Sequence, residues 1–440
     1  MGHLKQQRGQ FFTTNTTVQT VLGSLIQSPS GLLLEPSAGA GHLVKWAEES
    51  LAHEIEAVEL DSGISSVASS TISHEDFFIF AQGKDSRYGV ILGNPPYVAW
   101  RDVESSTRES AATVKAKYSD KTNLYHLFID RCIDLLAPGG ELVFIVPKEW
   151  LYATSASPLR KKMLASGSIT HLVDCGEEKL FDDADVPALL IFRFVKGTTS
   201  VSVQFAPSLL HAKNGDYAVR QLANVGDRLL LLEETLRASI SDWGLLKDSF
   251  RVRVGIVSGA DKVFRLPEGS DIEPECVKHY LTTKGIEPFV DVNHISSWGS
   301  MPPKTAAYLA QYKQDLMSRR IAKFDETNWW KYGAIRNRNH MLTSGERLYA
   351  FAKTRSQTPF FQNSSAVLFG GGILGLFREP SGSVSAATAV QVLNHPRYRQ
   401  VLEAMFLTTA DKVSLQPATL EDAPFPKTET DAKSWLAIQS

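Results

Sequence analysis

Short apolar runs of strand length alternate with helical stretches over residues 30–195, and this alternation constrains the fold more than any other feature of the sequence. A repeated strand–helix order is typical of a parallel sheet with helices on both faces. We therefore predict a doubly wound, mostly parallel α/β sheet. The expected strands are Gly31–Glu35, Glu54–Leu60, Gly89–Leu92, Glu141–Val146, Ile169–Cys175 and Ala188–Phe194, with helices at His42–Leu51 and Leu124–Leu136.

The pattern changes after about residue 200, where strands become sparse and aromatic and basic residues interleave with Gly, Ser and Asn loops. A chain of 440 residues is too long for one hydrophobic core, so we expect more than one domain. We place the boundary so that one domain covers residues 1–243 and a second, mixed α+β domain covers residues 244–440. Near the C-terminus, Pro424-Phe425-Pro426 is expected to pack back on the fold as a closing segment.

The composition excludes several classes of protein. The longest apolar runs, such as Leu142–Val146, are too short to span a bilayer, and the N-terminal "MGHLKQQRGQFF" lacks the apolar segment of a signal peptide. The three cysteines are widely separated, and the sequence has no Cys-x-x-Cys or His-Glu-x-x-His motif. We therefore expect no disulfide framework, no metal site and no membrane association, and a cytoplasmic location.

The segment "LLLEPSAGAGHL", residues 32–43, reads as a strand, a glycine-rich turn and the start of a helix. Gly39 and Gly41 allow a ligand to approach the backbone, and the helix N-terminus offers free N–H groups. A dinucleotide site would need a third glycine where Val44 stands, and the acidic Glu35 does not suit a pyrophosphate. Glu35 does suit ammonium and sulfonium groups, so we expect S-adenosylmethionine as the cofactor. The predicted contacts in this turn are Glu35, Pro36, Ser37, Ala38, Gly39 and Gly41.

Two more acidic residues mark the ends of the next strands. Glu59 ends the strand in "AVELD", where a carboxylate is placed to bind ribose hydroxyls, and Leu60 is expected to cover an adenine face. In "HEDFF", Asp76 is placed to accept a hydrogen bond from the adenine amino group and Phe77 to pack on the ring. A single carboxylate at a strand end is often only solvated. Their order at the carboxyl ends of successive strands favours one ligand crevice.

The segment "ILGNPPYVAW", residues 91–100, ends the fourth strand with an amide, two prolines and an aromatic ring. Pro95 and Pro96 remove two backbone donors and fix two φ angles, so the loop is stiff. The Asn94 side-chain oxygen and the Pro95 carbonyl are acceptors for the two hydrogens of an exocyclic amine, whose lone pair then points toward a methyl donor. Tyr97 offers a face on which the target base stacks.

Eight segments follow one another in the order "GQFFTTNTTVQTVL", "LEPSAGAGHL", "VELD", "HEDFF", "GNPPY", "NLYHLF", "PGGELVFIVP" and "KLFDDADVPALLIF". In this order the chain closely resembles the gamma-class N6-adenine DNA methyltransferases, the TaqI-methyltransferase-like modification enzymes, over roughly residues 9–195. The resemblance implies a Rossmann-like methyltransferase sheet. It also implies that Thr13 closes over the methionine end of the donor, although Thr14 stands where a proline is usual. Phe181 matches the family's second aromatic contact with a flipped base.

A local excess of positive charge occurs in the second half. Residues 313–355 hold ten Lys/Arg and four Asp/Glu, and aromatic rings interleave with them. This mixture fits a groove that follows phosphates, whereas a charge run alone would more often be a solvated face. The resemblance places a target-recognition region here, so double-stranded DNA is the expected partner. The candidate DNA contacts are Lys331, Arg336, Arg338, Lys353 and Arg355, with Trp329, Trp330, Tyr332, Phe360 and Phe361 as the interleaved rings.

These features predict a site-specific DNA adenine N6-methyltransferase that uses S-adenosylmethionine without a metal and flips its target base. We expect the modification half of a restriction–modification system, with a separate cognate restriction endonuclease as a candidate partner. Two alternatives stay open: an RNA or protein-glutamine N-methyltransferase with the same Asn-Pro-Pro-Tyr site, and a non-catalytic DNA-binding module. The long C-terminal domain disfavours the first, and the intact loop Asn94–Tyr97 disfavours the second.

Overall fold

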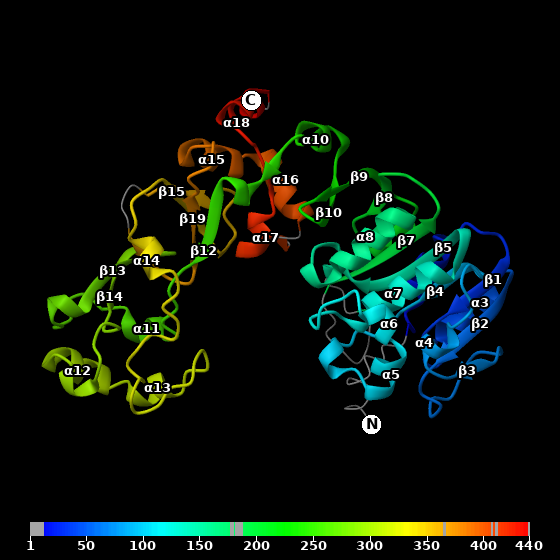
Figure 1. The fold of residues 1–440 in the computed structure, drawn as a ribbon, viewed down its shortest axis with the longest axis horizontal. Coiled ribbons are helices and arrows are strands. Elements are labelled where there is room, and N and C mark those ends of the chain that lie inside the picture. Colours follow the sequence, from blue (N-terminus) through cyan, green and yellow to red (C-terminus); the bar gives the residue numbers. More distant parts are fainter. Residues whose placement is uncertain are drawn as a thin grey trace. The chain divides into compact units, whose positions relative to one another are not determined.

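The chain forms two compact units, Met1–Arg237 and Ala238–Ser440. The computed structural model describes residues 13–176, 180, 188–363, 367–405, 408–409 and 412–438 (Figure 1). The expected domain boundary at residue 243 falls just inside the second unit. Within these described ranges, no helix combines the length and the hydropathy that a bilayer crossing requires.

A ten-stranded sheet forms the centre of the N-terminal unit, in the order β10-β9-β8-β6-β7-β5-β4-β1-β2-β3. Strands β3, β2, β1, β4 and β5 are parallel, and β7 runs antiparallel between β5 and β6 (Figure 1). The predicted doubly wound, mostly parallel sheet is confirmed. The strands are β1 (Gly31–Glu35), β2 (His53–Glu59), β3 (Ile72–His74), β4 (Tyr88–Gly93), β5 (Leu136–Pro147), β6 (Gly167–Asp174), β7 (Leu189–Lys196), β8 (Ser202–Ala206), β9 (Ala218–Val225) and β10 (Arg228–Leu232).

The expectation that strands become sparse after residue 200 is wrong. Strand β8 pairs in parallel with β6, and β9 and β10 extend the same sheet in antiparallel fashion. Part of this region carries a weak sequence signal near the edge of the sheet. In β9, for example, only Gln221 and Leu222 are buried, so polar and apolar residues do not alternate in the way that a half-buried strand requires.

Helices flank the parallel core of this sheet. Helices α2 (Thr16–Ser24), α3 (His42–Ser50) and α9 (Leu209–Lys213) share a buried apolar cluster with β1, β4, β5 and β7. Helices α7 (Leu124–Leu135) and α8 (Ser157–Ser166) pack against each other and against β5 and β6. The shorter helices of this unit are α4 (Phe77–Phe80), α5 (Ser105–Ser110), α6 (Ala112–Lys115) and α10 (Glu234–Ser239), the last of which crosses the boundary between the units.

The start of α7 is fixed by a capping box. The Asn123 side chain accepts a hydrogen bond from the backbone N–H of Tyr125, and His126 Nδ1 accepts one from the backbone N–H of Asn123. The backbone N–H of Leu124 donates to the carbonyl of Val98 at 2.8 Å. The helix therefore begins directly beside the chain that follows Asn-Pro-Pro-Tyr.

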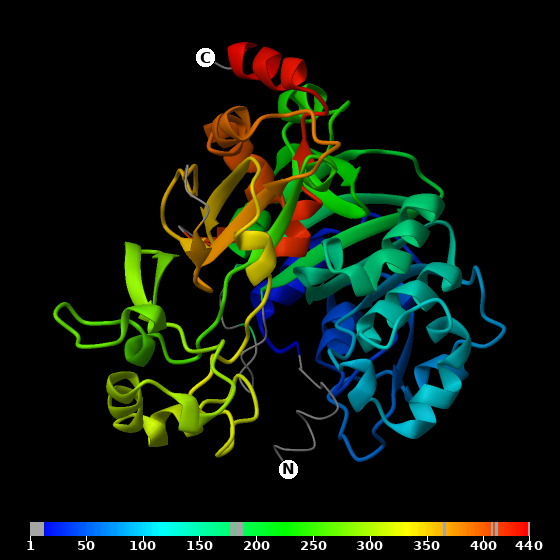
Figure 2. The ribbon, with the colours of Figure 1, turned by 60° about the vertical axis from the view of Figure 1, so that its left-hand side comes forward.

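Several smaller sheets and short helices make up the C-terminal unit (Figures 1 and 2). A large apolar cluster in this unit includes Phe264, Tyr280, Trp330 and Phe369. The two larger sheets are β12 (Phe250–Val254)-β19 (Ile373–Arg378)-β15 (Arg347–Phe351)-β17 (Phe360–Phe361) and β14 (Gly285–Val290)-β13 (Val277–Thr282)-β18 (Leu368–Phe369). The helices are α11 (Asp261–Phe264), α12 (Pro303–Ala310), α13 (Lys313–Met317), α14 (Arg338–Met341), α15 (Ala386–Leu393), α16 (Pro396–Ala404), α17 (Pro417–Glu421) and α18 (Glu429–Ile438).

Two minor sheets complete this unit. Strand β22 (Pro424–Phe425) pairs with β11 (Gly244–Leu245), and the Phe425 side chain is fully buried against Phe250. The expectation that the Pro424-Phe425-Pro426 segment packs back on the fold is therefore confirmed. Strand β21 (Lys412–Ser414) joins β16 (Lys353–Thr354) to β20 (Thr408–Thr409).

Candidate active site

The candidate site lies at the carboxyl ends of β1, β2 and β4. Strand β1 pairs with β2 on one side and with β4 on the other, so the chain winds in opposite directions from this point. Open α/β sheets bind ligands at such a switch point. Glu35 ends β1, Glu59 ends β2, and Asn94 directly follows β4.

The turn between β1 and α3 depends on glycine. Gly39 and Gly41 have left-handed φ values of +55° and +76°, which side chains other than glycine rarely adopt. A Cβ atom at Gly41 would also lie 3.0 Å from Ser66 Oγ and 3.2 Å from Ile72. The backbone N–H of Ala38 donates to the carbonyl of Val58, which holds the turn against β2.

Glu35 is a buried carboxyl group with one unsatisfied oxygen. Its Oε1 accepts hydrogen bonds from the Ser37 backbone N–H and hydroxyl at 3.3 and 3.4 Å, whereas Oε2 is buried and has no hydrogen-bond partner among the described residues. Burial raises the pKa of Glu35 to about 8; the bonds from Ser37 oppose this shift, and the nearby charge of Glu59 adds to it. A Cβ atom at Gly93 would lie 2.7 Å from Oε1, so glycine at this position leaves room for the carboxyl group. A cationic ligand group would satisfy the free oxygen.

Glu59 links the turn to β2. Its Oε2 accepts a hydrogen bond from the Gly39 N–H at 2.8 Å, and its Oε1 accepts one from the Asp61 N–H at 2.9 Å. Its position at the carboxyl end of β2 places this carboxylate at the edge of the sheet where such folds bind ligands. The following Leu60 is 44% exposed, which leaves its side chain accessible to a ligand.

Asp76 has a structural role that sequence reasoning missed. Its Oδ1 accepts hydrogen bonds from the Phe78 N–H, which caps α4, and from the Ser110 hydroxyl; its Oδ2 accepts one from Thr107. The "SHED" run before the helix carried this signal, because Asp at such a position is a preferred N-cap. The neighbouring Phe77 is buried and stacked on Phe128, with ring centroids 4.5 Å apart, so one face of its ring is already covered.

Asn94 connects three segments of the N-terminal unit. Its side-chain Nδ2 donates to Thr13 Oγ1 at 3.2 Å, and its backbone carbonyl accepts a hydrogen bond from the Ser37 hydroxyl at 3.1 Å. Gln19 in α2 donates to the Thr13 carbonyl and so fixes Thr13. Thr13, Ser37 and Asn94 line one pocket. The pocket also includes His42 and Leu43, which we did not predict from the sequence; the sequence indicates them only through their place in the first turn of α3. Its lining is Thr13, Glu35, Ser37, Ala38, Gly39, His42, Leu43 and Asn94.

Tyr97 is held against the sheet by its hydroxyl. This group hydrogen-bonds to Asn94 Oδ1 and lies 2.8 Å from the carbonyl oxygen of Ile145 in β5. The ring meets Tyr125 of α7 edge to face, with centroids 5.9 Å apart. Burial raises the pKa of the Tyr97 hydroxyl well above its usual range, so the group is a neutral donor. Pro95, between the two residues, is buried, and Pro96 is partly buried.

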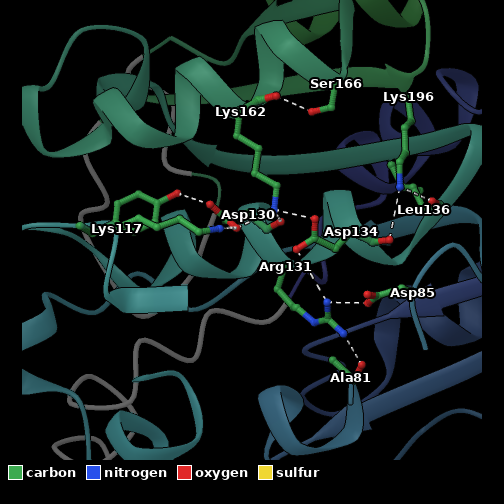
Figure 3. Close-up of polar contacts among 11 residues, drawn as sticks. Ala81, Asp85, Lys117, Asp130, Arg131, Asp134, Leu136, Lys162, Ser166 and Lys196 are labelled. Carbon is green, nitrogen blue, oxygen red and sulfur yellow. Dashed lines mark hydrogen bonds and ion pairs between the residues drawn. The ribbon is translucent and has the colours of Figure 1, made fainter. Parts of the chain in front are cut away.

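Helix α7 is anchored near its middle by a buried carboxylate. Asp130, whose side chain is 1% exposed, accepts a hydrogen bond from Lys162 of α8 at 2.7 Å and one from the Tyr118 hydroxyl at 2.7 Å (Figure 3). Lys117 lies 3.4 Å from the same carboxylate. The helix that supports Tyr97 through Tyr125 is thereby fixed to its neighbours.

Phe181, the expected second contact with a target base, lies outside the described residues. The basic window of the C-terminal unit is described, and it differs from the expectation in two ways. Arg338 Nη1 donates to the fully buried Asp291 at 2.6 Å, so this guanidinium holds the fold together. The aromatic rings at Trp329, Trp330, Tyr332 and Phe360 are buried and pack in the interior of this unit.

The other four predicted DNA contacts lie at or near the surface. Arg336, Lys353 and Arg355 are exposed, and Lys331 is partly buried. Two further basic residues of the window are structural: Arg319 donates to three backbone carbonyls, and Arg347 is likewise buried and bonded to carbonyls. The local excess of basic residues therefore overstates the charge that is available to a polyanion.

Residues 42–181 match the Eco57I restriction-modification methylase family. Curated relatives include the type II methyltransferase M.HincII of Haemophilus influenzae, 29% identical over 196 residues, which are 43% of this chain and 37% of the relative. The type II methyltransferase M.TthHB8I of Thermus thermophilus is 29% identical over 205 residues, which are 43% and 45% of the two chains. The match thus spans less than half of either relative. These similarities confirm the resemblance to gamma-class methyltransferases in the N-terminal half of the chain.

A solved structure supports the same fold over nearly the whole chain. The type IIL restriction-modification enzyme MmeI, determined in complex with DNA, is 10% identical, with a TM-score of 0.58. The comparison covers 99% of this chain and 67% of that one. At this identity the likeness concerns the fold alone.

Proposed function

We propose that this chain is a site-specific DNA adenine N6-methyltransferase that uses S-adenosylmethionine. One observation carries the proposal: the unsatisfied buried oxygen of Glu35 and the amide of Asn94 line the same pocket at the switch point of the sheet. A site for a cationic donor and a neutral hydrogen-bond acceptor for an amine therefore lie side by side. The similarity to type II methyltransferases supports DNA as the substrate.

The residues around the β1–α3 turn fit the donor. Glu35 Oε2 would bind the ammonium group of the methionine part, because a cation is the partner that a buried carboxylate lacks. Glu59, at the carboxyl end of β2, would bind ribose hydroxyls, and the exposed Leu60 would contact the adenine. Thr13 would close the methionine end. Bound S-adenosylmethionine supplies an electrophilic methyl group on a sulfonium.

Asn94 and Pro95 would position the acceptor amine. The amide oxygen and the Pro95 carbonyl each accept one hydrogen of the adenine amino group, so the nitrogen lone pair is directed at the methyl group. A neutral amide is too weak a base to remove a proton first, so the proton leaves during or after transfer. The stiff backbone at Pro95 and Pro96 keeps both acceptors in place without reorganisation.

Residues 1–243 would form the catalytic domain and residues 244–440 the target-recognition domain. An enzyme that acts on the amine of a paired adenine must extrude the base from the duplex. Tyr97 would stack on the extruded base, and Phe181 would contact its other face. Exposed Arg336, Lys353 and Arg355 would contact phosphates. A separate cognate endonuclease would cut unmodified DNA.

Methylation mapping tests this proposal. DNA from cells that express the protein should contain N6-methyladenine at one short sequence, and DNA from cells that express the Asn94→Ala variant should contain none. Methylated cytosine in place of adenine would contradict the assignment of the target base. Unmodified DNA together with methylated RNA or protein would contradict the assignment of the substrate.

A further inference from the structure

A hollow in the C-terminal unit carries polar groups that methyl transfer does not use. It lies beside helix α11 and the hairpin of β13 and β14, which are neighbours in Figure 1. The hollow is open to solvent on one side, and its cavity volume is about 80 Å³. Its lining is Ile256, Ser258, Asp261, Arg265, Tyr280, Thr282, Thr283, Phe289, Tyr332, Gly370, Gly371 and Gly372.

One face of α11 presents an acceptor and a donor to this hollow. Asp261 and Arg265 are four positions apart, and the Arg265 N–H donates to the Asp261 carbonyl at 2.9 Å, so their side chains are neighbours on the helix surface. Asp261 is exposed and accepts a hydrogen bond from the Ser258 hydroxyl. The Arg265 side chain is 31% exposed and forms an ion pair with Glu287, with 3.2 Å between Nε and Oε2.

Arg265 retains hydrogen-bonding capacity in spite of this ion pair. Its buried Nε–H is not aligned for a hydrogen bond to Glu287 or to any other described residue. A guanidinium has five N–H donors, so one carboxylate cannot satisfy them all. The hollow therefore contains donors and acceptors whose geometry is fixed before any ligand arrives.

Three consecutive glycines, Gly370, Gly371 and Gly372, form part of the rim of the hollow. None of Gly370, Gly371 and Gly372 has a left-handed φ, so the backbone conformation does not require glycine there. At Gly370 an added Cβ would meet nothing closer than the Leu281 carbonyl oxygen, at 4.0 Å. A glycine at this position instead leaves room for a ligand to approach the backbone closely.

A rigid frame holds these groups. The Ser258 carbonyl accepts hydrogen bonds from Arg319 Nη1 at 2.6 Å and from the Gly333 N–H at 3.1 Å. On the other side of α11, the Leu266 N–H donates to the Pro288 carbonyl in β14 at 2.9 Å. Such support on both sides is typical of sites that discriminate between ligands.

We propose that this hollow reads one G·C base pair of the target sequence; the inference rests on the proposed function as a DNA methyltransferase. Asp261 and Glu287 outweigh the single charge of Arg265, so the hollow disfavours a phosphate. A base-pair edge presents donors and acceptors together. Arg265 donates to guanine O6 and N7, and Asp261 accepts from the cytosine amino group. The bare backbone at Gly370 lets the edge approach.

The test compares the recognition sequences of variants by methylation mapping. Arg265→Gln and Asp261→Asn should each relax discrimination at the same single base pair by about 5- to 150-fold, the effect of one good base contact. Lys262→Gln is the matched control, because Lys262 is exposed on the same helix but does not line the hollow. Donor affinity and melting temperature should not change in any of these proteins.

A second variant separates ligand contact from folding. Gly370→Ala adds one methyl group that the protein itself accommodates, so its melting temperature should match that of the wild type while kcat/KM on target DNA falls. Unchanged recognition in the Arg265 and Asp261 variants, or an equal loss of binding to all sequences, would overturn the base-reading role. If the wild type methylates a defined site, such a result leaves the proposed function intact. If the wild type does not methylate DNA, both the proposed function and the base-reading role of the hollow are overturned.

Discussion

Asn94 Nδ2 donates a hydrogen bond to Thr13 Oγ1 over 3.2 Å and so joins the loop after β4 to a residue 81 positions earlier in the chain. The opposite side of the same amide is bonded to the Tyr97 hydroxyl, which also lies 2.8 Å from the Ile145 carbonyl. An amide held at both ends cannot rotate freely. The orientation of the acceptor is therefore set before the amine arrives, as electrostatic catalysis requires.

Asn94→Ala should remove methyl transfer and leave donor binding intact. The lost oxygen acts on the amine as it approaches the methyl group, and loss of one such preorganised contact costs on the order of 100-fold or more in rate. Single-turnover kinetics measure the chemical step, and calorimetry measures the donor Kd of the same variant. Turnover near that of the wild type would rule out the proposed role of Asn94.

Glu59→Ala should have the opposite effect and weaken donor binding. A hydrogen bond to a charged group contributes roughly 1.5–3 kcal/mol, or about 10- to 150-fold in affinity. Loss of the bond from Gly39 should add to this effect, because it loosens the turn that faces the ligand. Glu54→Ala is a suitable control, since Glu54 is exposed near the other end of β2. Equal donor Kd values for the two variants would show that Glu59 does not bind the donor.

Donor binding should release a proton at pH 7. The raised pKa of Glu35, about 8, means that the carboxyl group is protonated at pH 7 in the free protein, and an ammonium partner lowers that pKa again. Donor affinity should therefore rise between pH 6 and pH 8. Calorimetry in two buffers of different ionisation enthalpy counts the protons. Glu35→Gln should abolish the release, and a release of the same size in that variant would assign it to another group.

The same carboxyl group should reduce the stability of the free protein at high pH. Its pKa of about 8 in the folded protein exceeds the unfolded value of 4.5, so folding favours the protonated carboxyl group. This contribution to the free energy of folding is fully present below pH 4.5 and is lost as the pH rises through 8. Glu35→Gln should therefore raise the melting temperature at pH 8 and change it little at pH 4.5, while donor binding weakens. A variant that melts lower than the wild type at pH 8 would contradict this account of Glu35.

Stacking on Tyr97 should support base flipping. A duplex with 2-aminopurine at the target adenine should brighten when the wild type binds, because the base leaves the stack. Tyr97→Ala should reduce this signal and turnover, since stacking on a ring contributes roughly 1–3 kcal/mol per base. Tyr97→Phe keeps the ring and should keep most of the signal. Tyr97→Ala together with Phe181→Ala should cost more than either change alone; a dark duplex with the wild type would refute flipping.

Basic residues of the C-terminal unit should separate into two groups. Arg336→Ala and Lys353→Ala should weaken DNA binding at all sequences and flatten its salt dependence. Arg338→Ala should instead destabilise the protein, because the buried Asp291 loses its partner. The cost should be near the lower end of about 3–5 kcal/mol, since the Arg338 side chain is 27% exposed. Urea unfolding measures this loss of stability. An Arg338→Ala variant as stable as the wild type would show that the fold does not need the ion pair between Arg338 and Asp291.

The sequence predicts the parallel core well because its signals are local. Strand β1 has the predicted bounds Gly31–Glu35, and the glycine-rich turn and the Asn-Pro-Pro-Tyr loop follow their strands as expected. Glu35, Ser37, Gly39 and Asn94 meet in one pocket because parallel strands bring their carboxyl ends to the same edge of the sheet.

Contacts between distant segments could not be predicted in this way. Phe77 was expected to face a ligand, but its ring is covered by Phe128, which lies on a later helix. Trp329 and Trp330 are as consistent with a core as with a groove, and only the packing of the second unit decides between them. The pairing of Arg338 with Asp291 likewise depends on a contact across 47 positions of sequence.

Methyl transfer by the purified protein tests the central claim most directly. With a labelled methyl donor, the wild type should label duplex DNA on adenine N6, and the Asn94→Ala variant should bind the donor equally well but leave the DNA unlabelled. Label on a glutamine peptide or on RNA, with duplex DNA left unmodified, would contradict the account.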